Sequence, residues 1–152
     1  MKVDLILCDA ALRDPHTGKI SMLGAGWDQV PVVGQTITPH AVVAMVHVPW
    51  TDANRKHSMK FDLIDEDNAP VQTVDPAGSP VPVTVDAEFE VGRPPGVRPG
   101  SDLLATFTFT VAPGLPLVEG KSYSWVCNID AADSVRASFR AVSVPAAGVT
   151  QK

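Results

Sequence analysis

The sequence predicts an all-β protein, an antiparallel β-sandwich of about eight strands, and three observations support this prediction. Apolar and polar residues alternate along most of the chain, with the period of two that half-buried strands show. Turn residues separate these segments at nearly regular intervals. The 152 residues also include 14 prolines, which helix interiors tolerate poorly because proline lacks the N–H and clashes with the preceding turn. A closed barrel is the alternative architecture.

In the first half of the chain we expect strands at residues 3–11, 20–30, 41–48 and 57–65. The strand at 41–48 is nearly all apolar, which indicates burial on both faces. The strand at 20–30 contains Gly24 and Gly26, and glycines inside a strand indicate a bulge or a close backbone approach. A bulge that seats Trp27 in the core is the preferred interpretation. Contact with a partner backbone at these glycines is the alternative.

In the second half we expect strands at residues 71–74, 81–91, 103–111, 123–130 and 135–144. The segment 123–130 follows a turn rich in proline and glycine and alternates throughout, so it is predicted to be the central strand. Alternation places six aromatic side chains on inward faces, where we expect one buried cluster: Phe61, Phe89, Phe107, Phe109, Tyr123 and Trp125. Residues 1–144 are predicted to form a single domain, and residues 145–152 form a tail without a pattern.

Composition and charge exclude several classes of partner. Hydrophobic residues make up 45% of the chain and charged residues 19%, which is typical of a globular domain. The formal net charge of −5 argues against nucleic acid or an anionic membrane as a partner, because phosphates require a basic excess. No apolar run reaches the roughly 18 residues of a membrane span or the length of a secretory signal. We therefore expect a cytoplasmic protein, or a component of a particle that assembles in the cytoplasm.

Two resemblances refine this prediction. Leu117, Gly120, Tyr123 and Trp125 resemble the tyrosine corner of immunoglobulin-like and fibronectin-like sandwiches, which implies an immunoglobulin-like fold with the Tyr123 hydroxyl bonded to backbone a few residues upstream. The second resemblance covers most of the chain and rests on the segments 23–27, 48–50, 54–57 and 89–96. These segments are similar to an uncharacterised family of short bacterial proteins, mainly from actinobacteria and their phages. That family has no assigned activity, so this resemblance implies a fold and no catalytic residues.

The residues that metals prefer do not form a complete set of ligands. The acidic segment 65–68 lacks the glycine and the distant glutamate of a helix–loop–helix calcium site, so a hairpin turn is preferred over calcium. His47 and His57 would approach each other, with Asp52, only if their strands pair, and zinc needs more ligands than that. We therefore expect no metal and no other cofactor.

Two cysteines, Cys8 and Cys127, fit no metal spacing. Both fall on predicted strands, so a disulfide between the sheets is conceivable. Two buried free thiols are preferred in a reducing compartment.

Candidate contact residues lie at a strand end and in a proline-rich segment. Trp50 follows a proline at the end of the strand 41–48, where it either anchors a protein partner or caps the end of the sandwich. The segment 93–100 cannot form ladder bonds at its prolines, and we expect an extended, polyproline-like arm. This arm either crosses between the sheets or lies on a neighbouring protein. The candidate contact residues are Trp50, Arg93, Pro94, Pro95 and Arg98.

The sequence also lacks the patterns of common enzymes. It contains no Gly-x-Ser-x-Gly elbow, no phosphate-binding loop and no cysteine–histidine pair in a recognisable context. We therefore expect a non-catalytic protein that acts through protein–protein contacts or self-association, as an accessory or structural subunit of an assembly such as a phage particle. The alternative is a sandwich that binds a small molecule or a metal, a class that includes enzymes.

Overall fold

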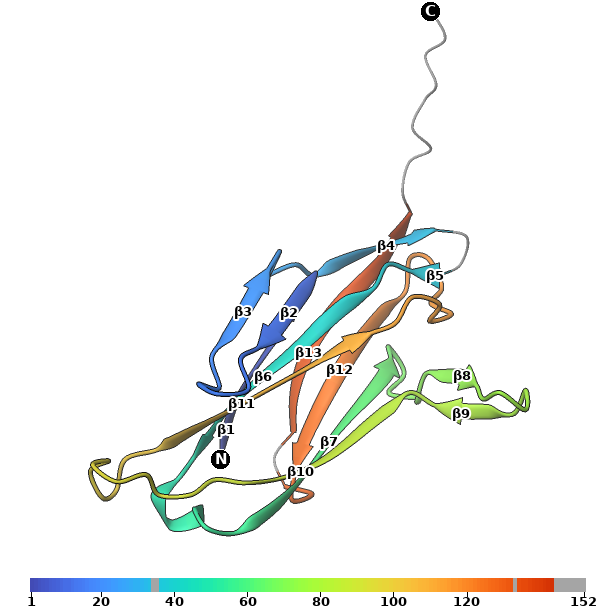
Figure 1. Ribbon diagram of the computed structural model, residues 1–152. Coiled ribbons are helices and arrows are strands. Elements are labelled where there is room, and N and C mark those ends of the chain that lie inside the picture. The colour runs from blue at the N-terminus through green and yellow to red at the C-terminus, as the bar shows by residue number, and fades with distance from the viewer. Residues whose placement is uncertain (34–35, 133, 144–152) are drawn as a thin grey trace, which may run out of the picture.

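The computed structural model describes residues 1–33, 36–132 and 134–143, and these residues form an all-β protein (Figure 1). The elements in chain order are β1 (Lys2–Cys8), β2 (Ala10–Arg13), β3 (Ile20–Leu23), β4 (Gln29–Val33), β5 (Thr36–Ile37), β6 (His40–Val48), the 3-10 turn η1 (Trp50–Asp52), β7 (Lys56–Asp65), β8 (Gln72–Val74), β9 (Pro80–Pro82), β10 (Thr84–Glu90), β11 (Leu103–Val111), β12 (Ser122–Ile129) and β13 (Ser134–Ser143). Within these ranges no helix has the length and apolar character that crossing a membrane requires. The predicted tail at 145–152 lies outside the described residues.

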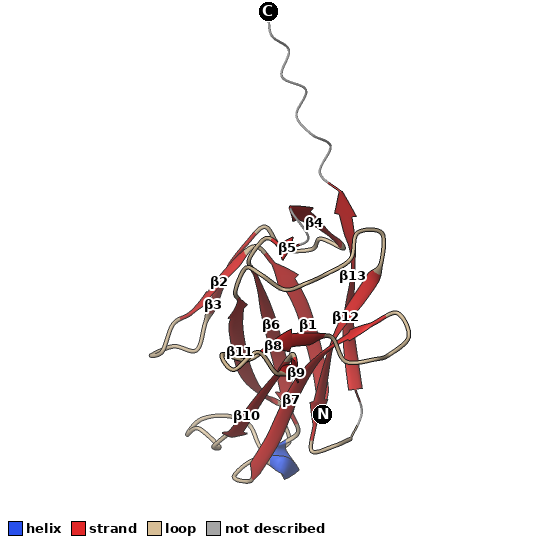
Figure 2. Cartoon of the chain, turned by 90° about the vertical axis from the view of Figure 1, so that its right-hand side faces the viewer, coloured by secondary structure: helices blue, strands red, loops and turns tan. Residues whose placement is uncertain are grey.

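The strands form two main sheets and two short hairpins (Figures 1 and 2). One sheet has the order β1-β6-β11, and the other has the order β10-β7-β12-β13-β4-β5. The pairs are antiparallel except β13 with β4, which is parallel. The hairpins β2-β3 and β8-β9 are sheets of their own. Strands β10 and β11 are edge strands of different sheets, although they are consecutive in the chain.

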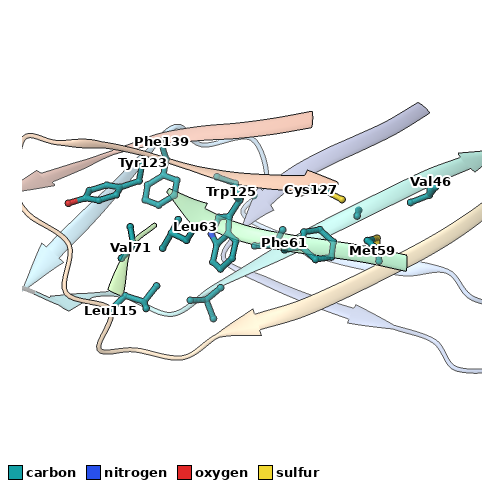
Figure 3. Close-up of a cluster of buried hydrophobic side chains, with 14 of the residues drawn as sticks. Val46, Met59, Phe61, Leu63, Val71, Leu115, Tyr123, Trp125, Cys127 and Phe139 are labelled. Atoms are coloured by element: carbon teal, nitrogen blue, oxygen red, sulfur yellow. The ribbon is translucent and has the colours of Figure 1, made fainter. Parts of the chain in front are cut away.

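The core lies between the two main sheets, and it contains the predicted aromatic cluster, of which Figure 3 shows Phe61, Tyr123 and Trp125. Phe61, Tyr123 and Trp125 are buried, while the phenylalanines of β10 and β11 are half-buried against them. The ring centroids of Phe109 lie 5.0 Å from those of Phe61 and 5.3 Å from those of Trp125, both in edge-to-face contact. Such pairs contribute stabilising free energy in addition to that from the apolar area that they bury. The predicted inward side of these strands is therefore confirmed.

A second, smaller cluster lies on the opposite face of the sheet β1-β6-β11. The hairpin β2-β3 covers this face with Ile20 and Met22, which pack against buried Cys8, Ala41 and Val43. This arrangement explains why β6 is buried on both faces, as its apolar sequence predicts. Cys8 belongs to this outer cluster and Cys127 to the core, and both are buried free thiols. The preferred interpretation of the cysteines is confirmed.

The prediction of one strand at 20–30 is wrong. Strand β3 ends at Leu23, and Gly24 and Gly26 follow with φ of +61° and +88°, which glycine adopts without strain. These residues form a corner and not a bulge. The corner carries the chain from the β2-β3 hairpin to β4 in the larger sheet. Trp27 then lies half-buried at the edge of the core, with its ring 6.0 Å from that of Phe139.

Two other predicted strands are also divided. The segment 3–11 forms β1 and β2, and the segment 81–91 forms β9 and β10, because Val83 bonds through its backbone to Leu63 and Val71 between the two strands. The all-β class is confirmed, while the count of about eight strands does not describe these shorter elements. At the start of β12 the Val118 N–H donates to the Tyr123 hydroxyl at 2.9 Å. This is the backbone contact that the tyrosine-corner resemblance implies.

Candidate functional site

Trp50 and Arg93, two of the five candidate contact residues, lie together. Trp50 begins η1 and packs half-buried against the core, and Arg93 follows the end of β10. The Arg93 guanidinium carbon lies 4.8 Å from the centroid of the Trp50 ring, and Nη2 donates to the Trp50 carbonyl oxygen at 2.8 Å. A cation–π contact and a hydrogen bond therefore fix the start of the proline-rich segment to the end of β6. These contacts give Trp50 a role in the fold, and its role as a partner contact remains a prediction.

The segment 93–100 is not an extended arm, contrary to the prediction. The Val97 N–H bonds to the Pro94 carbonyl at 3.3 Å, and the Ser101 N–H bonds to the Arg98 carbonyl at 3.2 Å. These are two consecutive turns. They connect β10 to β11 and so cross from one sheet to the other, which is the crossover that the sequence left open. Pro94, Pro95 and Arg98 are exposed on these turns. Their role as contact residues stays a prediction.

A groove of about 980 Å³ lies beside β11. The loop of the β2-β3 hairpin forms one wall, the end of β10 with Arg93 and Pro94 forms another, and residues Leu104–Phe107 of β11 lie between them. We call this feature the β11 groove. Its apolar lining includes Leu104, which is 56% exposed, and half-buried Phe107. Sequence reasoning missed it because it joins three segments that are distant in the chain.

Polar contacts hold the hairpin loop on β11 and set one wall of the groove. The Arg13 Nε donates to the Thr106 hydroxyl at 3.1 Å, and that hydroxyl donates to the Gly18 carbonyl at 2.5 Å. Gly18 has φ of +70°, which favours glycine in this turn. Asp14 closes the turn by accepting bonds from the backbone of His16 and from Thr17. The hydrogen bond from Thr17 holds the pKa of Asp14 below its ordinary value.

The outward face of the β2-β3 hairpin exposes two leucines. Leu12 is 73% exposed and Leu23 is 72% exposed. Leu12 pairs with Ser21, and Leu23 with Ala10, so the two leucines are diagonal neighbours across the hairpin. The alternating pattern predicts which side of a strand is apolar. It did not reveal that this hairpin is apolar on both sides.

The buried side chain of His57 pairs with Asp130 where β7 begins, and the Asp130 side chain is 41% exposed. Its Nδ1 lies 2.7 Å from Asp130 Oδ2, and its Nε2 lies 2.9 Å from the Asp52 carbonyl oxygen. Because both partners accept, this geometry favours the protonated ring, in which both nitrogens donate. Burial lowers the pKa of His57, but the hydrogen bonds to Asp130 and to the Asp52 backbone outweigh this and raise it above its ordinary value. The pair ties η1 to the turn after β12.

His40 is the second buried histidine, and its state is the opposite. The Trp125 indole Nε1 donates to His40 Nε2 at 3.1 Å in the core. Accepting this bond requires a neutral ring with its proton on Nδ1. Burial lowers the pKa of His40 to about 4, and the Thr38 backbone opposes only part of this shift. His40 is therefore a neutral structural residue at pH 7.

The structure does not bring His47 and His57 together, because β6 and β7 belong to different sheets. His47 instead pairs with Asp4 across β6 and β1, with 3.1 Å between Nε2 and Oδ2. Asp65 closes an ordinary turn by accepting bonds from the backbone of Asp67 and Ala69. Among the described residues, no three His, Cys, Asp or Glu side chains gather where they could hold a metal ion.

Comparison with known protein families identifies one that matches most of the chain. Residues 4–142 match the model of a family of unknown function, DUF6941. The chain belongs to DUF6941. No curated protein matches it. The matched region runs from Asp4 in β1 to Val142 in β13, so it contains the hairpin β2-β3, the β11 groove and nearly all of the two main sheets. The expected membership of an uncharacterised family is thus confirmed. Because the function of this family is unknown, membership does not assign an activity to the chain.

Proposed function

We propose that this member of DUF6941 is a non-catalytic protein that acts through protein–protein contacts, as an accessory or structural subunit of a larger assembly. The observation that carries the proposal is the pair of exposed leucines, Leu12 and Leu23, on the outward face of the β2-β3 hairpin. Contiguous exposed apolar residues mark sites of protein contact more often than isolated ones do.

The construction of the hairpin supports this proposal. Its inner face packs Ile20 and Met22 on the sheet β1-β6-β11, while its outer face presents the two leucines to solvent. A two-stranded hairpin is marginally stable by itself, and strands of only four residues form this one. A partner that covers Leu12 and Leu23 would bury the second apolar face and stabilise the hairpin from both sides.

Finer features of the proposal rest on the sequence resemblances. We propose that the two main sheets form an immunoglobulin-like sandwich, which the bond from the Val118 N–H to the Tyr123 hydroxyl supports. We also propose that the protein works in the cytoplasm or in a particle assembled there, with a phage-particle accessory protein as the most concrete form. The formal net charge of −5 supports a protein partner over nucleic acid.

Affinity capture from cells that naturally contain the protein, combined with light scattering of the purified chain, tests the proposal. The wild type should capture a stoichiometric protein partner or form a defined oligomer. Leu12→Ser with Leu23→Ser should abolish that complex, because the substitutions remove the central apolar contacts. Val74→Ser is the matched control, since Val74 is 69% exposed on the other hairpin, β8-β9.

The candidate contact residues of the crossover need a separate variant. Arg98→Ser is cleaner than Arg93→Ser, because Arg93 also holds Trp50 inside the molecule. Weaker capture by Arg98→Ser would extend the contact surface to the crossover. If the wild type and both variants behave as the same monomer and capture no partner, the proposed function is wrong.

A further inference from the structure

We propose that the free edge of β11 receives an extended, acidic segment of a partner protein as an additional strand. This inference rests on the proposed function, because it names the class of partner and a place where that partner binds.

The first observation is the unpaired edge. β11 ends the order β1-β6-β11 and pairs only with β6, from Leu103 opposite Val48 to Val111 opposite His40. Among the described residues, no backbone hydrogen bond joins β11 to any other strand. In an antiparallel pair, about half of the N–H and C=O groups of a strand point away from its partner. A nine-residue strand therefore offers a row of such groups to an incoming chain.

The second observation is that β11 lacks the features that normally protect an edge. Exposed edges usually carry charged residues or proline, or are short. β11 contains no charged residue and no proline. The opposite edge strand, β1, contains Lys2 and Asp4, which form an ion pair at 3.3 Å. The β11 edge thus lacks the protection that the β1 edge has, and at Leu104 it also exposes a large apolar side chain.

The third observation is the charge beside the edge. Three cationic side chains line the β11 groove, from Arg13, Lys19 and Arg93, against the single carboxylate of Glu90. This excess is local, since the whole chain has 12 basic and 17 acidic residues. The carboxylate of Asp14 is held by bonds within its own turn and does not line the groove. Charge complementarity therefore favours an acidic segment.

The two faces of an added strand would meet different surroundings. Thr106 lies on the side of the hairpin loop, where Arg13 contacts it. Phe107 lies on the core side, with its ring centroid 5.0 Å from that of Phe89. Because side chains alternate along a strand, carboxylates on one face would reach Arg13 and Lys19 while apolar residues on the other face approach Phe107. An alternating acidic and apolar segment fits this groove.

The charges also distinguish this partner from two alternatives. Strand β10 has a free edge too, but its exposed residues Asp86, Glu88 and Glu90 would repel an acidic segment. A second copy of the chain that paired β11 with β11 would bring the basic side chains of both grooves toward each other. Like charges across an interface weaken it. The observations therefore favour an acidic segment of another protein over self-association at this edge.

The test uses the full chain and labelled synthetic peptides of about ten residues, the length of a long strand. The probe alternates Glu with Val. One control peptide has Lys in place of Glu, and the other has Pro in place of Val, which removes alternate N–H donors and disfavours a ladder. Fluorescence anisotropy measures binding at about 20 mM and about 300 mM salt, because screening acts on exposed charges. NMR hydrogen exchange then identifies the amides that become protected.

We expect the Glu peptide to bind at least about tenfold more tightly than the Lys peptide and to weaken in the higher salt. Amides of β11 should gain protection, and those of β1 should not. Arg13→Gln with Lys19→Gln should weaken binding about fivefold, the scale of two exposed ion pairs. Leu104→Asp should also weaken it. Val118→Asp is the matched control and should not, since Val118 and Leu104 are equally exposed at 56%.

Several results would overturn the inference. Equal binding of the Glu and Lys peptides, or no binding, would show that the edge does not select an acidic partner. Equal binding of the Pro and Glu peptides, or protection of amides outside β11, would show that the peptide does not add a strand to β11. A dimer that Leu104→Asp disrupts would assign the edge to a second copy. If Leu12→Ser with Leu23→Ser abolishes native capture while Leu104→Asp does not, the proposed function stands and this inference fails. If peptides bind as expected but the chain captures no native partner, the proposed function is the part that fails.

Discussion

Replacing His40 should remove a large part of the pH dependence of stability. His40 begins β6 and is 1% exposed, and its Nε2 accepts the indole N–H of Trp125 at 3.1 Å. Burial lowers its pKa to about 4, so the folded protein keeps the ring neutral where an unfolded chain would protonate it. The folded and unfolded states therefore bind different numbers of protons between about pH 4 and the ordinary histidine pKa of 6.5.

The sign and magnitude of the effect follow from linkage. The unfolded chain binds more protons in this window, so the free energy of unfolding falls as the pH decreases from 6.5 to about 4. At about 1.4 kcal/mol for each pH unit, the gap corresponds to about 3 kcal/mol. The stability that neutral His40 permits is fully present above pH 6.5. It is lost progressively as the solution becomes more acidic.

Urea unfolding of the wild type and His40→Gln at pH 7 and pH 4 measures this effect. Glutamine accepts the Trp125 hydrogen bond but does not titrate. Carboxylates that titrate near pH 4 are common to both proteins, so the difference between the proteins isolates His40. His16→Gln, on the exposed turn after β2, should retain the wild-type dependence. If the free energies of the wild type and His40→Gln change in parallel between pH 7 and pH 4, the neutral buried state of His40 is wrong.

Three further predictions test the core, the pair of His57 with Asp130 and the absence of metals. Trp125→Ala should lower the free energy of unfolding by about 3–5 kcal/mol, because it leaves a cavity and an unpaired His40. A loss below about 1 kcal/mol would contradict the burial of Trp125 in the core. Asp130→Asn should lower the pKa of His57, measured by NMR, because the hydrogen bond that the ring donates to the Asp130 carboxylate raises this pKa, and an unchanged pKa would refute this cause. Elemental analysis of protein purified without chelator should find no stoichiometric zinc or calcium, and one equivalent of either would revive the metal-binding alternative.

The sequence was sufficient to predict the strands whose neighbours cover only one face. Met59, Phe61 and Leu63 point inward on β7, as the alternation predicts, and so do Tyr123 and Trp125 on β12. In these strands the period of two follows directly from burial of one side. The bond between the Tyr123 hydroxyl and the backbone of Val118 was also predictable, because these residues are close together in the chain.

The sequence was not sufficient where a segment changes sheet or is covered on its second face. Nothing in the alternation of residues 20–30 shows that β3 pairs with β2 while β4 joins β13. Alternation also does not reveal that Ile20 and Met22 pack on the outside of a sheet, which leaves Leu23 exposed. These outcomes depend on tertiary packing and not on local pattern.

The β11 groove was missed for the same reason. Of its cationic side chains, the sequence singled out only Arg93, and it did so for the proline-rich segment. Arg13 and Lys19 flank an ordinary turn and became notable only when Thr106 was found beside them. Trp50 was predicted as a contact residue, but its pairing with Arg93 links two segments more than 40 residues apart.

Hydrogen exchange of the native complex, compared with the free chain, tests the central claim most directly. If the protein acts through the surfaces that we propose, the backbone amides of the hairpin β2-β3 and of β11 should exchange more slowly in the complex. The β8-β9 hairpin should exchange at the same rate in both, which provides an internal reference. Protection that is confined to other surfaces, with β2, β3 and β11 unchanged, would contradict the account.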